Sequence, residues 1–148
     1  MLILNVATIV CIGLMIGTEF AVSAFINPVL RKLESGLQMH VIRLFARKLG
    51  FVMPFWYGLC LLLLLVETFV FRHQSQVPLL AVASGIWVLV IILTLLFLVP
   101  INNRLARSET SAMIDRALKD HRKWEVMHRM RVLALTTAMI LLLISAGS

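Results

Sequence analysis

The chain has 148 residues, of which 61% are hydrophobic and only 14% are charged, and its mean hydropathy is +0.98. This composition excludes an ordinary soluble domain of the same length and indicates an integral membrane protein. The net charge of +7 does not indicate a nucleic-acid-binding protein. The Lys and Arg side chains lie beside apolar segments, where lipid head groups are their natural partners.

The first predicted membrane span covers residues 2–27. Residues 1–18 carry no charged side chain, Glu19 interrupts the apolar run, and Pro28 is expected to end the helix. A cleaved signal peptide is the alternative, but no Lys or Arg precedes Arg31, so the basic segment of such a peptide is missing. We therefore expect this span to be retained.

Gly13 and Gly17 form a GxxxG pair in the first span. This spacing permits close packing of helices and would suit a homo-oligomer, although it also arises by chance in apolar segments. Either interpretation fits the sequence.

Residues 34–49 are predicted to form a cytoplasmic amphipathic helix, which either lies in the membrane interface or connects two spans. Leu37 and Val41 share one side of it, whereas His40 and Arg43 share another. Gly50 is expected to separate this helix from the second span.

Three further spans are predicted at residues 50–71, 79–101 and 126–146. Only about seven residues join the second span to the third, so these two should form an antiparallel hairpin. The polar segment 107–123 reads as a connector to the fourth span. The predicted fold is an all-α integral membrane four-helix bundle that makes a single domain, 1–148.

The sequence offers no motif for a metal or a cofactor. Cys11 and Cys60 lie apart in apolar runs, with no Cys-x-x-Cys pair and no His at metal-ligand spacing, and there is no Gly-rich phosphate loop. We read both cysteines as small apolar packing residues and expect neither a metal nor a cofactor.

The basic residues predict the orientation of the bundle. Lys and Arg are frequent in the connectors 31–48 and 104–131, whereas the hairpin loop contains only Arg72. By the positive-inside rule the two long connectors are cytoplasmic, and both termini lie outside. We expect a protein of the bacterial inner membrane.

The candidate site is at the cytoplasmic end of the bundle. On a helix, Trp124, His128 and Arg131 fall within an arc of roughly 60°. Glu19 begins a second polar stripe, which includes Asn27. On an α-helix the side-chain direction changes by only about 80° around the helix axis from Glu19 to Asn27, eight residues later. A carboxylate in hydrocarbon costs several kcal/mol unless it is paired, hydrated or protonated. We expect Glu19 to pair with Arg131 or to hydrogen-bond His128.

The same end should hold further polar and aromatic side chains from spans two and three. These are Trp56, Tyr57, Asn102 and Asn103. A purely structural role for Glu19 and simple interfacial solvation of His128 stay open. His40, His73 and His121 read as surface residues, and Glu67 could simply reach the outer interface.

Several motifs together resemble the anthrone oxygenase-like family of small four-helix membrane proteins. They are Gly17-Thr18-Glu19-Phe20 with Asn27-Pro28, the run 53–57 (MPFWY), the run 99–104 (VPINNR), and Trp124-x-x-x-His128-x-x-Arg131. Members of this family in aromatic polyketide pathways oxidise an anthrone to an anthraquinone with molecular oxygen, and many bacterial relatives have no assigned substrate. The resemblance implies the fold more firmly than the reaction.

The implied chemistry assigns a role to each site residue. His128 would be the base, Arg131 with Asn102 or Asn103 would stabilise the oxyanion, and Glu19 would orient His128. The side chains that could contact a flat aromatic substrate are Asn27, Trp56, Tyr57, Asn102, Asn103 and Trp124. The expected partners are membrane lipid and a hydrophobic aromatic small molecule.

Two other classes of function stay open. One is a lipid- or quinone-binding membrane protein with no reaction of its own. The other, ranked lower, is a haem-binding redox protein that uses His128 and His40. A transporter ranks lowest, because four spans would have to oligomerise to form a pathway.

Overall fold

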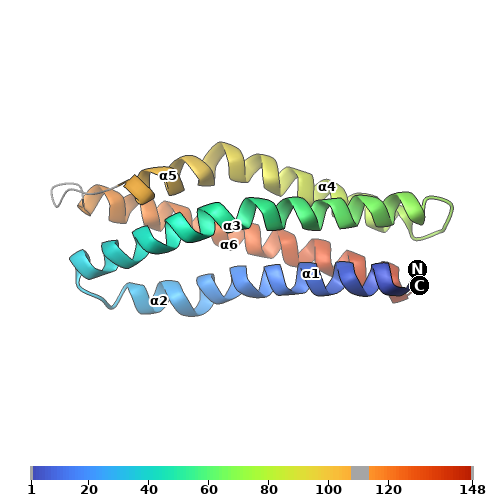
Figure 1. The fold of residues 1–148 in the computed structure, drawn as a ribbon, viewed down its shortest axis with the longest axis horizontal. Coiled ribbons are helices and arrows are strands. Elements are labelled where there is room, and N and C mark those ends of the chain that lie inside the picture. The colour runs from blue at the N-terminus through green and yellow to red at the C-terminus, as the bar shows by residue number, and fades with distance from the viewer. Residues whose placement is uncertain (1, 108–113, 148) are drawn as a thin grey trace.

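The computed structural model describes residues 2–107 and 114–147, which form four long helices (Figure 1). Each is long and apolar enough to cross a membrane, which confirms the predicted all-α, four-span fold. The first contains α1 (Leu2–Ala21), η1 (Val22–Ile26) and α2 (Asn27–Leu30), and the second is α3 (Ser35–Val70). The third contains α4 (Val77–Leu93), η2 (Thr94–Leu98) and α5 (Val99–Arg107), and the fourth is α6 (Ile114–Gly147).

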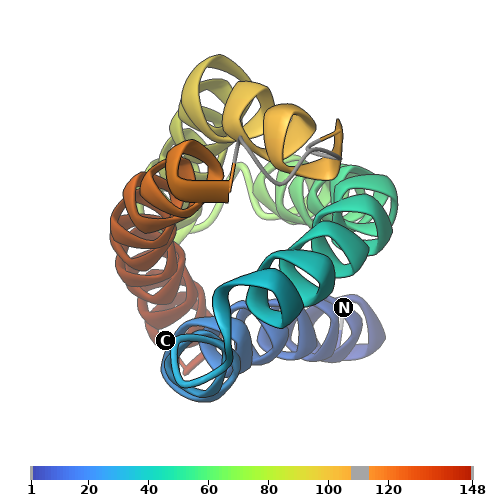
Figure 2. The same ribbon diagram turned by 90° about the vertical axis from the view of Figure 1, so that its left-hand side faces the viewer.

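The four helices are arranged as the corners of a square when the bundle is viewed along its axis (Figure 2). α1 and the α4–η2–α5 helix occupy opposite corners, and α3 and α6 occupy the other two. The turn at residues 71–76 joins α3 to α4 as the predicted antiparallel hairpin. Both chain ends lie at the same end of the bundle as this turn (Figure 1).

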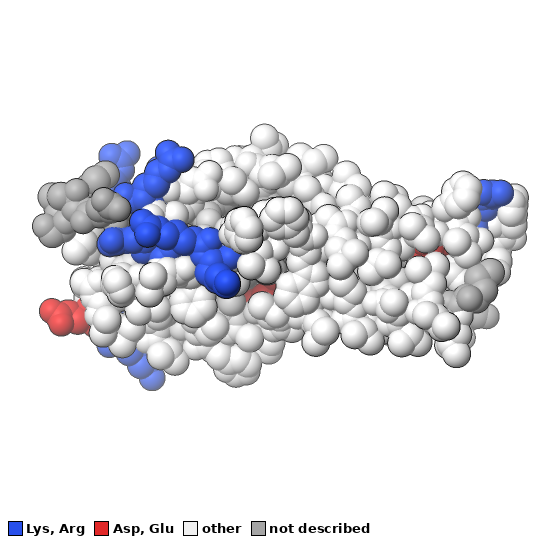
Figure 3. Space-filling view, viewed as in Figure 1, with Lys and Arg blue, Asp and Glu red and all other residues white. Residues whose placement is uncertain are grey.

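The outer surface of the bundle is apolar along most of its length. Large side chains such as Leu62, Phe69 and Leu96 are exposed there, as expected for an integral membrane protein. Lys and Arg gather at the end opposite the chain termini, which we call the basic end (Figure 3). The assignment of the basic end to the cytoplasm stays a prediction.

Two π-helical segments precede the prolines of the first and third helices. The Asn27 N–H donates to the Val22 carbonyl and the Val99 N–H to the Thr94 carbonyl, both five residues back. Pro28 and Pro100 follow directly. Contrary to the prediction, Pro28 does not end the first helix, which continues to Leu30. The wider π-helical turn before Pro28 accommodates a residue that has no backbone N–H to donate.

α3 runs for 36 residues without a break at Gly50, where the sequence predicted a boundary. The amphipathic segment is thus continuous with the predicted second span in one helix, and its place at the cytoplasmic membrane surface stays a prediction. Glycine is found here because of packing: a Cβ at Gly50 would lie 2.6 Å from Nδ2 of Asn102 on α5. The absence of a Cβ at Gly50 leaves room for the Asn102 side chain of α5.

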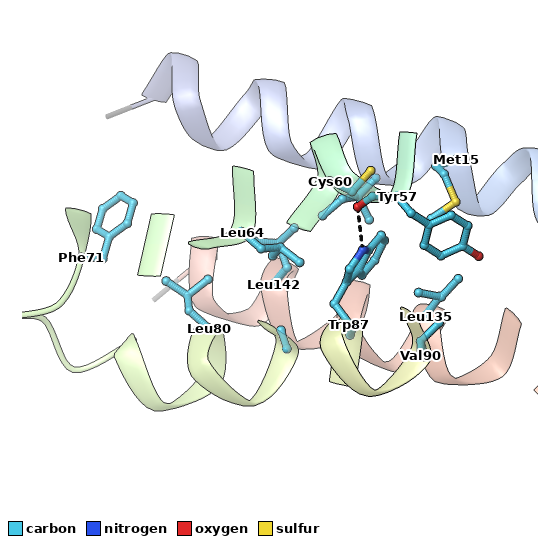
Figure 4. Close-up of a cluster of buried hydrophobic side chains, with 13 residues drawn as sticks. Met15, Tyr57, Cys60, Leu64, Phe71, Leu80, Trp87, Val90, Leu135 and Leu142 are labelled. Atoms are coloured by element: carbon cyan, nitrogen blue, oxygen red, sulfur yellow. Dashed lines mark hydrogen bonds between the residues drawn. The ribbon is translucent and has the colours of Figure 1, made fainter. Parts of the chain in front are cut away.

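The interior contains two apolar clusters that leave a gap between them. The larger surrounds Trp87, Leu64 and Leu135 in the half near the termini (Figure 4). The smaller surrounds Ile42 and Leu105 at the basic end. The candidate site lies between the two clusters, where each helix contributes polar side chains to the interior.

Candidate functional site

A cavity of about 410 Å³ lies inside the bundle between the two apolar clusters. All four long helices line it, and we call it the central cavity. Most of its wall is apolar, and the volume is within the range of small-molecule sites. Its polar and polar-tipped lining residues are Thr18, Glu19, Tyr57, Thr94, Asn102, Asn103, Trp124, His128 and Arg131.

Glu19, His128 and Arg131 form one interaction network at the wall of the cavity. The Arg131 guanidinium donates to Oε2 of Glu19 from NH2 at 2.5 Å and from Nε at 3.1 Å. Nδ1 of His128 lies 3.1 Å from the same oxygen. Both contacts expected for Glu19 are therefore present, and they join α1 to α6. The carboxylate is only 3% exposed, so its charge depends on these partners.

The surrounding hydrogen bonds define the tautomer of His128. Its Nε2 lies 3.0 Å from the Glu19 carbonyl oxygen, which can only accept, so Nε2 carries the proton. NH2 of Arg131 lies 2.8 Å from Nδ1 and donates to it. In the neutral ring Nδ1 thus holds the lone pair. A proton taken up at Nδ1 would face the Glu19 carboxylate.

Trp124 belongs to a stack of three rings on one face of α6. The His128 ring lies 4.5 Å from the indole centroid and the His121 ring 5.9 Å, both nearly parallel to it. His121 is buried, so the prediction of a surface residue is wrong. Its side chain falls on the same helical face as Trp124 and His128, which places it inside the bundle. The rings stacked on this indole are imidazoles of the protein.

The two asparagines of α5 both line the cavity, but they differ in their contacts. Nδ2 of Asn102 donates to the Ala46 carbonyl at 2.9 Å and so holds α5 against α3. Asn103 is exposed and borders the cavity from the same helix. Of the two amides, that of Asn103 is the one not committed to α3 by a hydrogen bond.

Three predicted site residues occupy different surroundings. Tyr57 lines the cavity and is buried, with the Arg131 guanidinium carbon 5.4 Å from its ring centre. Trp56 is half-buried and packs against the larger apolar cluster instead. Asn27 is buried and lines a second, smaller cavity of about 40 Å³ nearer the basic end, which Trp124 and Asn102 also border.

The sequence did not indicate two interior polar residues. Thr94 lines the central cavity from η2, and its only sequence signal is a lone hydroxyl in the apolar run before Pro100. Glu67, expected to reach the outer interface, is fully buried, and neither carboxylate oxygen has a hydrogen-bond partner among the described residues. It does not line the central cavity.

Within residues 2–107 and 114–147, no group of three His, Cys, Asp or Glu side chains is placed to hold a metal ion. Cys11 and Cys60 are free, with their sulfur atoms 3.7 Å apart. His40 is exposed on α3, whereas His128 is buried on α6.

In a comparison with known families, residues 39–141 match the family described as anthrone oxygenase. This range is more than two thirds of the chain. The chain belongs to the anthrone oxygenase family. The matched range of this family member contains Tyr57, Trp124, His128 and Arg131, whereas Glu19 and Asn27 precede it. Family membership indicates an oxygenase-related role. No curated protein and no solved structure matches the chain.

Proposed function

We propose that this protein is a membrane-embedded oxygenase that oxidises an anthrone-like or other hydrophobic phenolic or aromatic substrate with O₂, without a cofactor. The observation that carries the proposal is the position of Nδ1 of His128, which lies beside both Arg131 and Glu19 at the wall of a ligand-sized apolar cavity. This arrangement provides a base, a charge partner and a binding volume together.

The reaction begins with removal of a proton from the carbon between the two aromatic rings. Nδ1 of His128 gives up its hydrogen bond from Arg131 and takes this proton, and the substrate becomes an electron-rich enolate that transfers electrons to O₂ directly. Overall one O₂ is consumed per substrate. One oxygen atom becomes the new ketone, and the other leaves as water with the two hydrogens of the reacting carbon.

Glu19 and Arg131 have complementary roles in this scheme. The protonated imidazole would carry a positive charge 2.8 Å from NH2 of Arg131, which alone would oppose proton transfer. The Glu19 carboxylate contacts both cations and compensates for this repulsion. Glu19 and Arg131 thus act as positioning residues for the base. In this scheme Arg131 contacts His128 and does not stabilise the oxyanion on the opposite side of the substrate.

Oxygen uptake tests this proposal. The protein in lipid nanodiscs is given a simple anthrone, and the rate is corrected for spontaneous oxidation in empty nanodiscs. We expect His128→Ala to lose the excess uptake, whereas His40→Ala, which removes an exposed histidine outside the cavity, retains it. Equal rates for the His128→Ala variant and the unaltered protein would overturn the assignment of the base.

A non-catalytic quinone- or lipid-binding role is the second candidate. The apolar wall of the cavity and its polar groups would also suit a ligand that carries a carbonyl group. This role predicts a small molecule that co-purifies with the protein and no oxygen uptake above the empty-nanodisc control.

A further inference from the structure

Thr94 differs from the other threonines that the structure describes. Thr8, Thr18, Thr68, Thr136 and Thr137 each donate a hydrogen bond to the carbonyl four residues earlier. This is the usual way in which a helical hydroxyl is satisfied in an apolar environment. Oγ1 of Thr94 is buried and has no hydrogen-bond partner among the described residues. The hydroxyl is therefore available to a molecule that the chain itself does not supply.

The local backbone gives Thr94 a special position. It is the first residue of η2, and its carbonyl accepts from the Val99 N–H five residues later. The side chain lines the central cavity. Short π-helical segments inside α-helices are frequent at functional sites.

Tyr57 provides a second hydroxyl of the same kind. Its side chain is 5% exposed, and its hydroxyl has no hydrogen-bond partner among the described residues. The Trp87 indole donates to the Tyr57 carbonyl at 3.2 Å, which ties this part of α3 to α4. In Figure 4 the hydroxyl of Tyr57 points away from the larger apolar cluster. The ring is fixed by packing, and its hydroxyl lies near the Glu19 carboxyl without forming a hydrogen bond of good geometry.

Tyr57 and Thr94 line the cavity from two different long helices. Tyr57 lies beside Arg131, which belongs to the network of the base. η2 is at the corner of the bundle opposite α1, which carries Glu19 (Figure 2). A flat ligand between them would meet a hydroxyl near the base and another across the cavity.

We propose that the Thr94 and Tyr57 hydroxyls are specificity-determining groups that hydrogen-bond oxygen atoms on two edges of a planar fused-ring ligand. This inference rests on the proposed function, because it concerns the substrate of the same cavity. It selects ring systems with keto or phenolic oxygens over hydrocarbons of equal shape. Without such a ligand both hydroxyls stay buried and unpaired, which is the source of the discrimination.

Binding of two probes that do not undergo the reaction tests the proposal separately from oxidation. Anthraquinone and anthracene share the three-ring shape, but only anthraquinone carries oxygen atoms. Affinity for each is measured in lipid nanodiscs by quenching of tryptophan fluorescence, after subtraction of partitioning into empty nanodiscs. We expect the protein to bind anthraquinone about 10-fold more tightly than anthracene.

Substitutions then assign this preference to the hydroxyls. Thr94→Val should reduce the anthraquinone preference by about 3- to 10-fold and leave anthracene binding unchanged, and Thr94→Ser should restore the preference. Tyr57→Phe in the Thr94→Val background should remove what preference remains. The matched control is Thr137→Val, whose exposed hydroxyl bonds the Leu133 carbonyl and which should keep the full preference.

The outcomes separate this inference from the proposed function. An unchanged preference in Thr94→Val, or no preference in the unaltered protein, overturns the inference. A preference that depends on Thr94, in a protein without oxygen uptake, supports the inference and overturns the oxygenase assignment.

Discussion

Replacement of Glu19 by glutamine tests the charge arrangement at the base. The substitution keeps the shape of the side chain and removes the negative charge that contacts both His128 and Arg131. At an effective dielectric constant of about 20, unit charges 3.1 Å apart interact by about 5 kcal/mol. If movement of Arg131 recovers about half of this energy, the cost of protonating His128 rises by roughly 2–3 kcal/mol, which slows proton removal by about 30- to 150-fold.

The assay is the initial rate of oxygen uptake with an anthrone in nanodiscs, at saturating substrate. Glu67→Gln is the matched control, because it makes the same substitution at another fully buried carboxyl on a membrane span outside the central cavity. We expect its rate to equal that of the unaltered protein. A Glu19→Gln variant that folds normally and keeps more than half of the rate would refute the idea that the carboxylate supports protonation of His128.

Two further substitutions follow from the packing of the bundle. Gly50→Ala places a Cβ 2.6 Å from Nδ2 of Asn102 and should displace that amide into the central cavity. The lost hydrogen bond and the better helix propensity offset each other within about 1 kcal/mol, so the melting temperature should change little while oxygen uptake falls. A large drop in melting temperature with normal uptake would contradict this. Glu67→Leu removes a buried carboxyl whose oxygens have no well-formed hydrogen bond among the described residues, and it should stabilise the protein by about 1–3 kcal/mol, seen as a higher melting temperature in detergent. A lower melting temperature would show that Glu67 has a stabilising partner, for which the Thr8 hydroxyl is the candidate.

Helical periodicity was sufficient to predict the polar network, but it could not predict the backbone irregularities. Glu19 and Arg131 were expected to meet because each lies on a polar stripe at the same end of its span. An α-helix would carry Asn27 about 80° away from Glu19. The π-helical turn rotates less per residue and reduces this drift, and both side chains are in fact 3% exposed.

Side-chain packing between helices was also beyond the reach of the sequence. Gly50 reads as a helix boundary until the neighbouring Asn102 is seen to occupy the space that a Cβ would take. Thr94 resembles any threonine in an apolar run, since only the structure shows that its hydroxyl does not bond the preceding turn. For Gly50 the deciding neighbour lies on another helix. For Thr94 the deciding feature is the local change from α-helix to π-helix.

The length of α3 has a consequence for where the reaction would take place. Its 36 residues extend over about 54 Å, well beyond a hydrocarbon layer of about 30 Å. Measured from Leu2 along the first helix, Glu19 lies about 25 Å deep. A membrane surface at the level of the chain termini would place the ion pair near the opposite boundary and not at the bilayer centre. A water-insoluble ligand can arrive sideways from the lipid, while protons and product water leave to the adjoining aqueous phase.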